Sequence, residues 1–269
     1  MAGQTFGRRI LVLAAHPDDE VVACATAIGR AKARGAEILA LYLTDGCLAR
    51  ETMWPWRRAG HAKAVARRRA EAEGAAEWLG IIPVGWMARP TRRLWRELPQ
   101  VHAEIRAAVS AHAPDQLWVP AYEGGNPDHD ALNALGSLFT DKLSVLEFAE
   151  YNFFEGRARS QQFPYPTGGE RTIVLTPEEQ ERKRGLLRHY ASERGNLNYV
   201  DVARECFRPL AAYDYSRPPH PGVLWYARFH WVPFRHPRVD FTRPQEVSRA
   251  ICAYLNEAAG QEKSPRASP

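Results

Sequence analysis

The residues best suited to chemistry lie in the segment Ala15-His-Pro-Asp-Asp-Glu20. Its imidazole and its carboxylates can bind a metal ion or transfer protons. The segment follows an apolar run over residues 10–15, which predicts a buried parallel strand. Pro17 cannot donate to a sheet ladder and disfavours helical geometry at His16, so the strand must end there. The sequence therefore places these groups at the carboxyl end of a strand, where open α/β sheets bind ligands.

A second set of candidate ligands follows another predicted strand, over residues 116–120. The loop after that strand ends in Asn-Pro-Asp-His, with the histidine at position 129. His16, Asp19 and His129 would form a set of two histidines and one carboxylate. Three protein ligands with an open fourth position are typical of a catalytic rather than a structural zinc site. Iron(II) accepts the same set, so Zn²⁺ is expected, with Fe²⁺ or another divalent ion left open.

Two further aspartates adjoin these candidate ligands. Asp18 is expected to point toward the reacting water as general base, and Asp128 to orient a ligand histidine from behind. Each motif also has a structural interpretation: a His-Pro pair can end a strand in a turn, and Asp-Asp can cap a helix. Two histidine-bearing Pro-Asp loops at two strand ends favour the metal site over those interpretations.

The elements around these motifs alternate between strand and helix through residues 1–150. Apolar runs predict strands, and amphipathic stretches with caps predict helices between them. The strands are expected at residues 10–15, 37–44, 81–87, 116–120 and 145–150, and the helices at 20–35, 63–80, 98–112 and 130–143. This order predicts an α/β fold, a Rossmann-like three-layer sandwich with a mostly parallel sheet, as the catalytic core.

Residues 151–260 are expected to form a C-terminal, aromatic-rich extension that packs on this core and shapes the substrate pocket. Helices are predicted at 176–190 and 245–255, while 208–244 is rich in proline and aromatic residues without a clear period. That stretch is expected to wrap the core or to form a lid. The polar end, residues 261–269, is expected to be disordered.

Within the predicted helix 63–80, Arg68 and Glu71 lie on one face at a spacing of three residues. A surface ion pair is the plainer interpretation, and a role in the pocket is the alternative.

Aromatic residues in two segments are candidates for substrate selection. Trp54 and Trp56 lie in a loop, and Trp225, Tyr226 and Trp231 lie in the aromatic tail. Exposed tryptophans often border a pocket, although packing against the body of the protein explains the loop pair equally well.

The composition argues against nucleic-acid binding, disulfide bonds and a membrane span. The net charge of +5 and the pI near 9.1 raise the question of nucleic-acid binding. However, 31 acidic residues nearly match the 36 lysines and arginines, and no aromatic-basic motif is present, so a solvated surface is favoured and an anionic substrate stays open.

The four cysteines form no CxxC pair, which indicates reduced thiols. Neither a signal peptide nor a membrane span is expected, which favours a cytoplasmic location.

Taken together, the motifs resemble those of the LmbE/PIG-L deacetylase family. The resemblance rests on residues 15–20 after the first strand, Thr44-Asp-Gly46 after the second, and Pro-Asp-His129 after the fourth. Arg68-x-x-Glu71, leading to Leu79-Gly80, also matches the family pattern. The resemblance covers about the first 150 residues.

This resemblance implies a zinc-dependent N-deacetylase that removes an acyl group, typically acetyl, from an N-acetylglucosamine-like sugar. Water activated by the metal would attack the amide carbonyl. By position it implies these roles: His16, Asp19 and His129 as metal ligands, Asp18 as general base, and Arg68 as a substrate contact. The expected partner is a small N-acetylated sugar or glycoside rather than nucleic acid, and a homo-oligomer is compatible with the sequence.

One departure concerns catalysis. The family's second motif usually reads His-Pro-Asp-His, and here Asn126 takes the first position. That histidine is thought to stabilise the oxyanion or to protonate the leaving group, and an asparagine can donate a hydrogen bond but cannot act as an acid. Three explanations of this departure are open. Asn126 is sufficient for catalysis, a tail histidine such as His220 or His230 replaces the missing histidine, or activity is reduced. An active enzyme is favoured because the ligands and the base are retained, and the alternative is a catalytically weakened metal- or sugar-binding protein.

Overall fold

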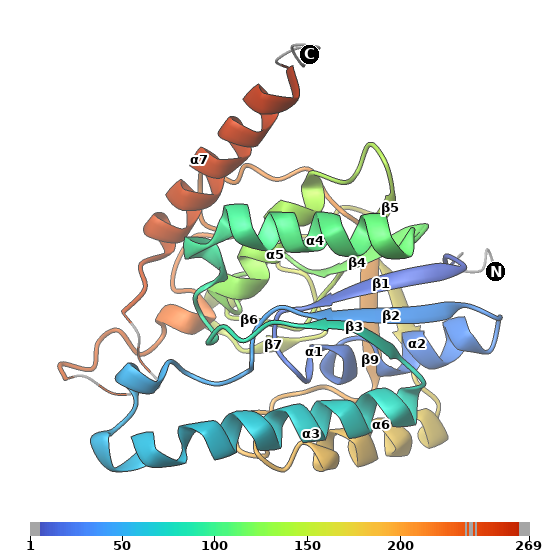
Figure 1. Cartoon of the computed structure of the whole chain (residues 1–269), viewed down its shortest axis with the longest axis horizontal. Helices are drawn as coiled ribbons and strands as arrows, with labels where there is room; N and C mark the ends of the chain where they lie inside the picture. The colour runs from blue at the N-terminus through green and yellow to red at the C-terminus, as the bar shows by residue number, and fades with distance from the viewer. Residues whose placement is uncertain (1–5, 235, 237–238, 240, 264–269) are drawn as a thin grey trace.

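The computed structural model describes residues 6–234, 236, 239 and 241–263 and is built around a seven-stranded sheet with the order β3-β2-β1-β4-β5-β9-β8 (Figure 1). Five strands are parallel: β1 (Arg9–Ala14), β2 (Glu37–Tyr42), β3 (Ile82–Trp86), β4 (Gln116–Pro120) and β5 (Ser144–Phe148). Two antiparallel strands extend the sheet beyond β5: β9 (Arg204–Pro209) and β8 (Arg171–Val174). A separate pair is formed by β6 (Tyr151–Asn152) and β7 (Arg159–Ser160). The predicted α/β fold with a mostly parallel sheet is confirmed.

Helices cover both faces of this sheet (Figure 1). One face carries α4 (Leu98–His112), α5 (Pro127–Ser137) and α7 (Pro244–Lys263). The other carries α1 (Asp19–Val22), α2 (Ala25–Lys32), α3 (His61–Leu79) and α6 (Pro177–His189). Short 3-10 turns are η1 (Arg50–Thr52), η2 (Pro55–Gly60), η3 (Leu94–Arg96), η4 (Phe154–Gly156) and η5 (Trp225–Ala227).

The two helical layers explain why the first strand is apolar throughout. Ile10 and Val12 pack with residues of α2, α3 and α6, whereas Leu11 and Leu13 pack with residues of α4, α5 and α7. All four side chains are buried. A strand covered on both faces cannot alternate apolar with polar residues, so it forms a continuous apolar run.

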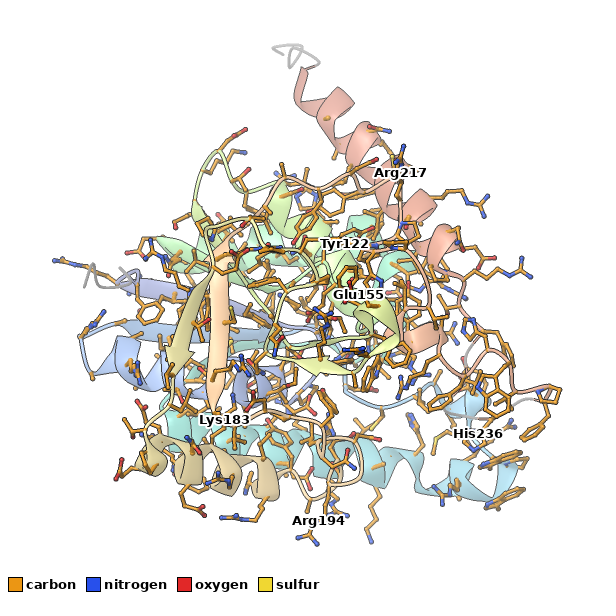
Figure 2. All side chains as sticks on the ribbon, turned by 180° about the vertical axis from the view of Figure 1, so that it is seen from behind. Tyr122, Glu155, Lys183, Arg194, Arg217 and His236 are labelled. Atoms are coloured by element: carbon orange, nitrogen blue, oxygen red, sulfur yellow. The ribbon has the colours of Figure 1, made fainter. Side chains whose placement is uncertain are left out.

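The predicted helix 20–35 is instead two helices, α1 and α2. The carboxylate of Glu205, on β9, accepts hydrogen bonds from the backbone N–H groups of Thr26 and Ala27 at 2.9 and 2.8 Å and so starts α2 anew. Lys183, which lies on α6 and is labelled in Figure 2, binds Glu205 at 2.9 Å. Because this cap comes from a distant part of the chain, the local pattern could not predict the interruption.

Other element boundaries also differ from the sequence prediction. Helix α5 begins at Pro127 rather than Asp130, because the Asn126 side chain caps it. Strands β8 and β9 were not predicted; they join the same sheet as the core strands, and β8 buries only one of its four side chains, so it lacks an apolar signal.

The C-terminal helix is longer than predicted. Helix α7 continues to Lys263, so the expectation of disorder over 261–269 is wrong for 261–263, where the helix-forming Gln-Glu-Lys sequence extends the helix. Residues 264–269 lie outside the described residues.

Two expectations from composition can be compared with the structure. All four cysteines are free within the described chain. None of its described helices combines the length and apolarity that a membrane crossing requires.

Candidate metal centre and active site

The two histidine-bearing motifs meet because their strands are neighbours. Strand β1 pairs in parallel with β4, so the loops after both strands emerge at the same edge of the sheet. His16 follows β1, and Asp19 begins α1. His129 lies in the first turn of α5, directly after the loop that follows β4.

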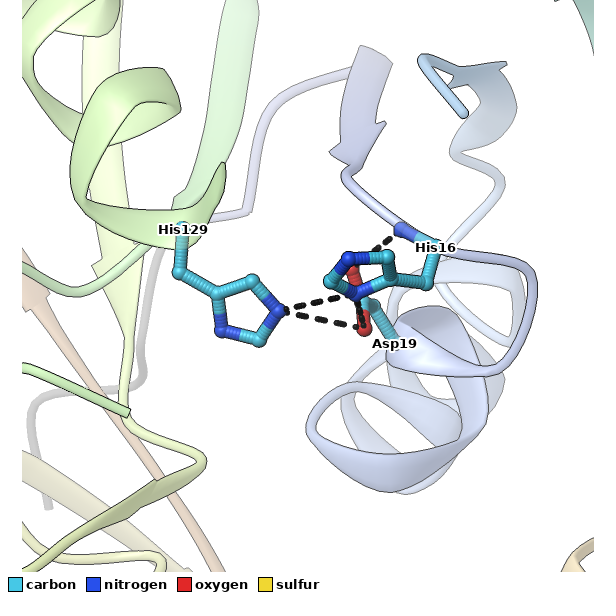
Figure 3. Close-up of side chains that lie close together, drawn as sticks. All are labelled: His16, Asp19 and His129. Atoms are coloured by element: carbon cyan, nitrogen blue, oxygen red, sulfur yellow. Dashed lines mark hydrogen bonds and ion pairs between the residues drawn. The ribbon is translucent and has the colours of Figure 1, made fainter. Parts of the chain in front are cut away.

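At this edge, the side chains of His16, Asp19 and His129 form a buried triangle of donor atoms (Figure 3). The His16 Nδ1 and His129 Nε2 atoms lie 3.2 Å apart. Asp19 Oδ1 lies 3.5 Å from each of these nitrogens. Nitrogen and oxygen ligands at the usual bond lengths of a tetrahedral zinc ion lie roughly 3.3 Å from one another. The three side chains thus match one face of such a coordination shell.

The charges at the triangle also suit a cation. Although burial works against a charged ring, the carboxylates of Asp19 and Asp128 raise the pKa of His16 to about 10. Although burial favours the neutral acid, the charges of His129 and His16 lower the pKa of Asp19. The site therefore stabilises positive charge between its donors, as a site for a divalent cation would.

Asp128 fixes the orientation of His16. Its Oδ2 lies 3.1 Å from His16 Nε2, and its Oδ1 accepts a hydrogen bond from the backbone N–H of Leu94 at 2.9 Å. Thr91 donates to the same carboxylate at 3.2 Å. This contact leaves Nδ1 of His16 facing the other two donor atoms, which is the arrangement expected of a residue that orients a ligand histidine.

Sequence reasoning missed Glu150, which lies behind the second histidine. Its Oε2 is 4.0 Å from His129 Nδ1, and both residues are buried. Burial raises the pKa of Glu150 well above its usual range, and the charges of Asp19 and Asp18 add to the rise. The residue lies two positions after the end of β5, at the same sheet edge as His16, which is the signal that could have identified it.

Asp18 lies next to the triangle in an uncommon backbone conformation, with φ at 137°. Its backbone N–H donates to Glu20 Oε2 at 3.1 Å. Its carboxylate is paired with Arg68 Nη2 at 2.8 Å. Burial raises the pKa of Asp18 to about 6, and the charge of Arg68 opposes this rise. A carboxylate with such a pKa is suited to general base catalysis near neutral pH.

Arg68 and Glu71 do not form the surface ion pair that their spacing suggested. Both are buried. Arg68 binds Asp18 with one nitrogen and Glu193 with another, the latter at 2.6 Å. Glu71 accepts a hydrogen bond from the backbone N–H of Ser192 at 3.0 Å. This helical motif therefore connects the candidate base to the loop after α6, which the sequence did not indicate.

The Thr44-Asp45-Gly46 motif makes room for that arginine. The Thr44 hydroxyl donates to the carbonyl of Ala15 at 2.7 Å and ties the end of β2 to the end of β1. Gly46 has φ at 70°, and a Cβ there would lie 2.9 Å from Arg68 Nε and from Pro17 Cδ. A side chain at position 46 would thus displace either the arginine or the turn that carries His16.

Asn126 has a structural role that the motif did not reveal. Its Oδ1 accepts a hydrogen bond from the backbone N–H of Asp128 at 3.0 Å, so it is the N-cap of α5. Among the described residues, neither His220 nor His230 lines the cavity that contains Asn126. The ring of His220 instead packs edge-on against Phe154.

The candidate site opens into a cavity of about 590 Å³. Its polar wall includes His16, Asp18, Asp19, Arg68, Asn126, Glu150 and Glu193, and its aromatic wall includes Tyr151, Tyr199, Trp225, Tyr226 and Phe229.

Of the aromatic residues expected to select the substrate, only two line this cavity among the described residues, namely Trp225 and Tyr226. Trp54 and Trp56 stack on each other with ring centroids 5.1 Å apart. Trp231 is 77% exposed.

The fold and the site together define an α/β protein with a candidate metal centre, the His-Asp-His triangle, at the carboxyl ends of its strands. The sequence also matches a known family: residues 11–139 fit the profile described as "PIG-L: GlcNAc-PI de-N-acetylase". The chain therefore carries a domain of the PIG-L (LmbE-like) family. No match was found among curated protein sequences.

Three solved structures of deacetylases have the same fold. The deacetylase of teicoplanin biosynthesis in its complex with bog has a TM-score of 0.60 and 18% identity, over 77% of this chain and 99% of that one. The A40926 pseudoaglycone deacetylase Dbv21 has a TM-score of 0.57 and 17% identity, over 77% and 100%. The zinc-inhibited form of the teicoplanin deacetylase Orf2 has a TM-score of 0.56 and 19% identity, over 77% and 99%. At these identities the similarity shows the fold.

Proposed function

We propose that this protein is a metal-dependent hydrolase that removes an N-acyl group, in particular acetyl, from a small molecule containing an amino sugar. The observation that carries this proposal is the buried His16-Asp19-His129 triangle with a second carboxylate, Asp18, beside it at a cavity. The PIG-L family domain and the deacetylases that share the fold support the same reaction.

His16, Asp19 and His129 would hold the ion. A divalent ion there would supply a Lewis acid for the amide carbonyl and would lower the pKa of water. Zn²⁺ suits the donor set, and Fe²⁺ or another divalent ion is compatible with it.

Asp18 accepts a proton from the attacking water and returns it to the amine nitrogen as the carbon–nitrogen bond breaks. Arg68 keeps the carboxylate of Asp18 charged and oriented through their 2.8 Å contact. This arginine already binds Asp18 and Glu193. It can therefore contact substrate only through the N–H groups that these two acids do not use.

The substrate fits the cavity in size and character. A volume of about 590 Å³ accommodates a glycoside, and one polar and one aromatic wall suit the hydroxyl groups and the apolar faces of a sugar ring.

The direct test is a panel of N-acetylated amino sugars and glycosides incubated with protein reconstituted with Zn²⁺ or Fe²⁺. Acetate release is expected from at least one member, and a chelator should abolish it until metal is added again. A panel that includes free, glycosylated and phosphorylated sugars and yields no acetate with any divalent ion would refute the proposal.

The second candidate function is that of a catalytically weakened protein. It is considered because Oδ1 of Asn126 already accepts the capping hydrogen bond of α5. Asn126→His removes the cap of α5, so we expect a stability loss of about 1 kcal/mol. If the site functions with asparagine, the rate of acetate release should change by less than about tenfold. Chemical denaturation and steady-state kinetics measure both effects. A gain of about a hundredfold or more, the size of one oxyanion donor, would favour the weakened protein instead.

A further inference from the structure

We propose that the cavity contains an anion-binding subsite, formed around Arg228, that takes a phosphate or carboxylate group of the substrate. Arg228 lines the cavity that holds the candidate metal centre. The inference deepens the proposed function and rests on it, because the anion would belong to the N-acylated molecule.

Arg228 is held rigidly by aromatic groups. Its guanidinium carbon lies 4.0 Å from the ring centroid of Trp225 and 4.4 Å from that of Phe229. One nitrogen, Nη1, donates to the carbonyl of Trp225 at 2.6 Å. These contacts orient the planar group but use few of its five N–H donors. A guanidinium fixed in this way loses little conformational entropy when it binds an anion.

Within the described part of the chain, no acidic side chain balances the charge of Arg228. Among the described residues, no carboxylate lies within ion-pair distance of this half-buried side chain, whereas Arg68, Arg89 and Arg208 each bind one. Burial lowers the pKa of Arg228; the phenol groups of Tyr151 and Tyr199 act against this, while the charge of Arg92 lowers it further. A guanidinium in a partly desolvated wall, without a carboxylate partner among the described residues, favours a bound anion.

The subsite and the candidate metal centre share one wall. Trp225, which carries the guanidinium, packs against Tyr151 with ring centroids 5.2 Å apart. Tyr151 in turn packs against His129 at 5.7 Å. One substrate can therefore present its acyl group to the metal centre and an anionic group to Arg228.

Two chemical groups fit this subsite. Phosphate and carboxylate both present oxygen pairs to the edge of a guanidinium, and both form charge-assisted hydrogen bonds with it. The molecule carrying the group is then an N-acylated amino-sugar phosphate or an N-acylated glycoside with a carboxylate.

The test compares substrates that differ in charge. Acetate release is measured with methyl N-acetylglucosaminide, N-acetylglucosamine 1- and 6-phosphate, and carboxymethyl N-acetylglucosaminide. Wild-type protein is expected to prefer at least one anionic compound over the neutral glycoside by about tenfold or more in kcat/KM. Preference for the phosphates or for the carboxymethyl compound identifies the anionic group.

Arg228→Gln should reduce the ratio of anionic to neutral kcat/KM by about ten- to a hundredfold. Arg228→Lys, which keeps the charge but loses the planar edge, should reduce it less. The matched control is Arg217→Gln, since Arg217 lies outside the cavity lining and its exposed side chain pairs with Asp214. The labelled position of Arg217 is visible in Figure 2.

Calorimetric binding separates this inference from the proposed function. If wild-type protein binds N-acetylglucosamine 1- or 6-phosphate at least tenfold more tightly than Arg228→Gln does, the subsite holds even without turnover. Equal binding of charged and neutral compounds by wild-type protein would overturn it. An equal loss for both kinds of compound in Arg228→Gln would also overturn it, as would a folded Arg228→Gln with unchanged selectivity.

Discussion

Asp18→Asn is expected to lower kcat for acetate release by about a thousandfold or more while metal content stays at the wild-type level. The amide has nearly the shape of the carboxylate, but it cannot accept a proton from water. It also loses the charge that pairs with Arg68 at 2.8 Å. The candidate ligands His16, Asp19 and His129 are unchanged, so the ion should remain bound.

Metal analysis and steady-state kinetics on the same preparation check this prediction. Asp214→Asn is the matched control, because Asp214 pairs with Arg217 and lies outside the cavity lining. Wild-type turnover in Asp18→Asn would show that another group accepts the proton. Loss of the metal in this variant would instead make Asp18 part of the ligand set.

His16→Ala has the second large expected effect, a loss of both the bound metal and acetate release. The substitution removes one of the three donors, and Nδ1 of His16 lies only 3.2 Å from the donor nitrogen of His129. It also leaves the carboxylate of Asp128 without its histidine partner in a buried site. A ligand that binds only the folded state raises its stability, so added metal should raise the Tm of wild-type protein but not that of the variant.

Metal content and Tm with and without Zn²⁺ or Fe²⁺ measure this effect independently of any substrate. His112→Ala serves as control, since His112 lies at the C-terminal end of α4 outside the described cavity lining. An unchanged metal content in His16→Ala would refute the assignment of this ligand.

Local sequence was sufficient for the parts of the site that follow from strand ends. An apolar run interrupted by His-Pro marks the end of β1, and Pro-Asp-His after the fourth predicted strand marks the end of β4. Parallel strands end at the same edge of a sheet, so these two patterns place His16 and His129 at one edge, and the pairing of β1 with β4 brings them together.

Residues that depend on distant contacts could not be predicted in this way. Glu193 reaches the cavity because Glu71 holds the adjacent Ser192, and Glu205 divides the first helix by capping α2. Arg228 lies in a stretch without a helical or strand period, so nothing local indicated that it would face the cavity. The motif indicates a chemical role for Asn126, whereas its capping contact depends on where α5 begins.

Arg68, which binds both Asp18 and Glu193, couples substrate specificity to proton transfer, two properties that enzymes commonly change separately. Glu193 belongs to a cavity-lining loop that can diversify with the substrate, yet its carboxylate binds the same guanidinium that controls Asp18. Exchanging that loop to obtain a new specificity would therefore also alter proton transfer for every substrate. Selection for a new substrate must retain an acid at position 193 or restrain the arginine in another way.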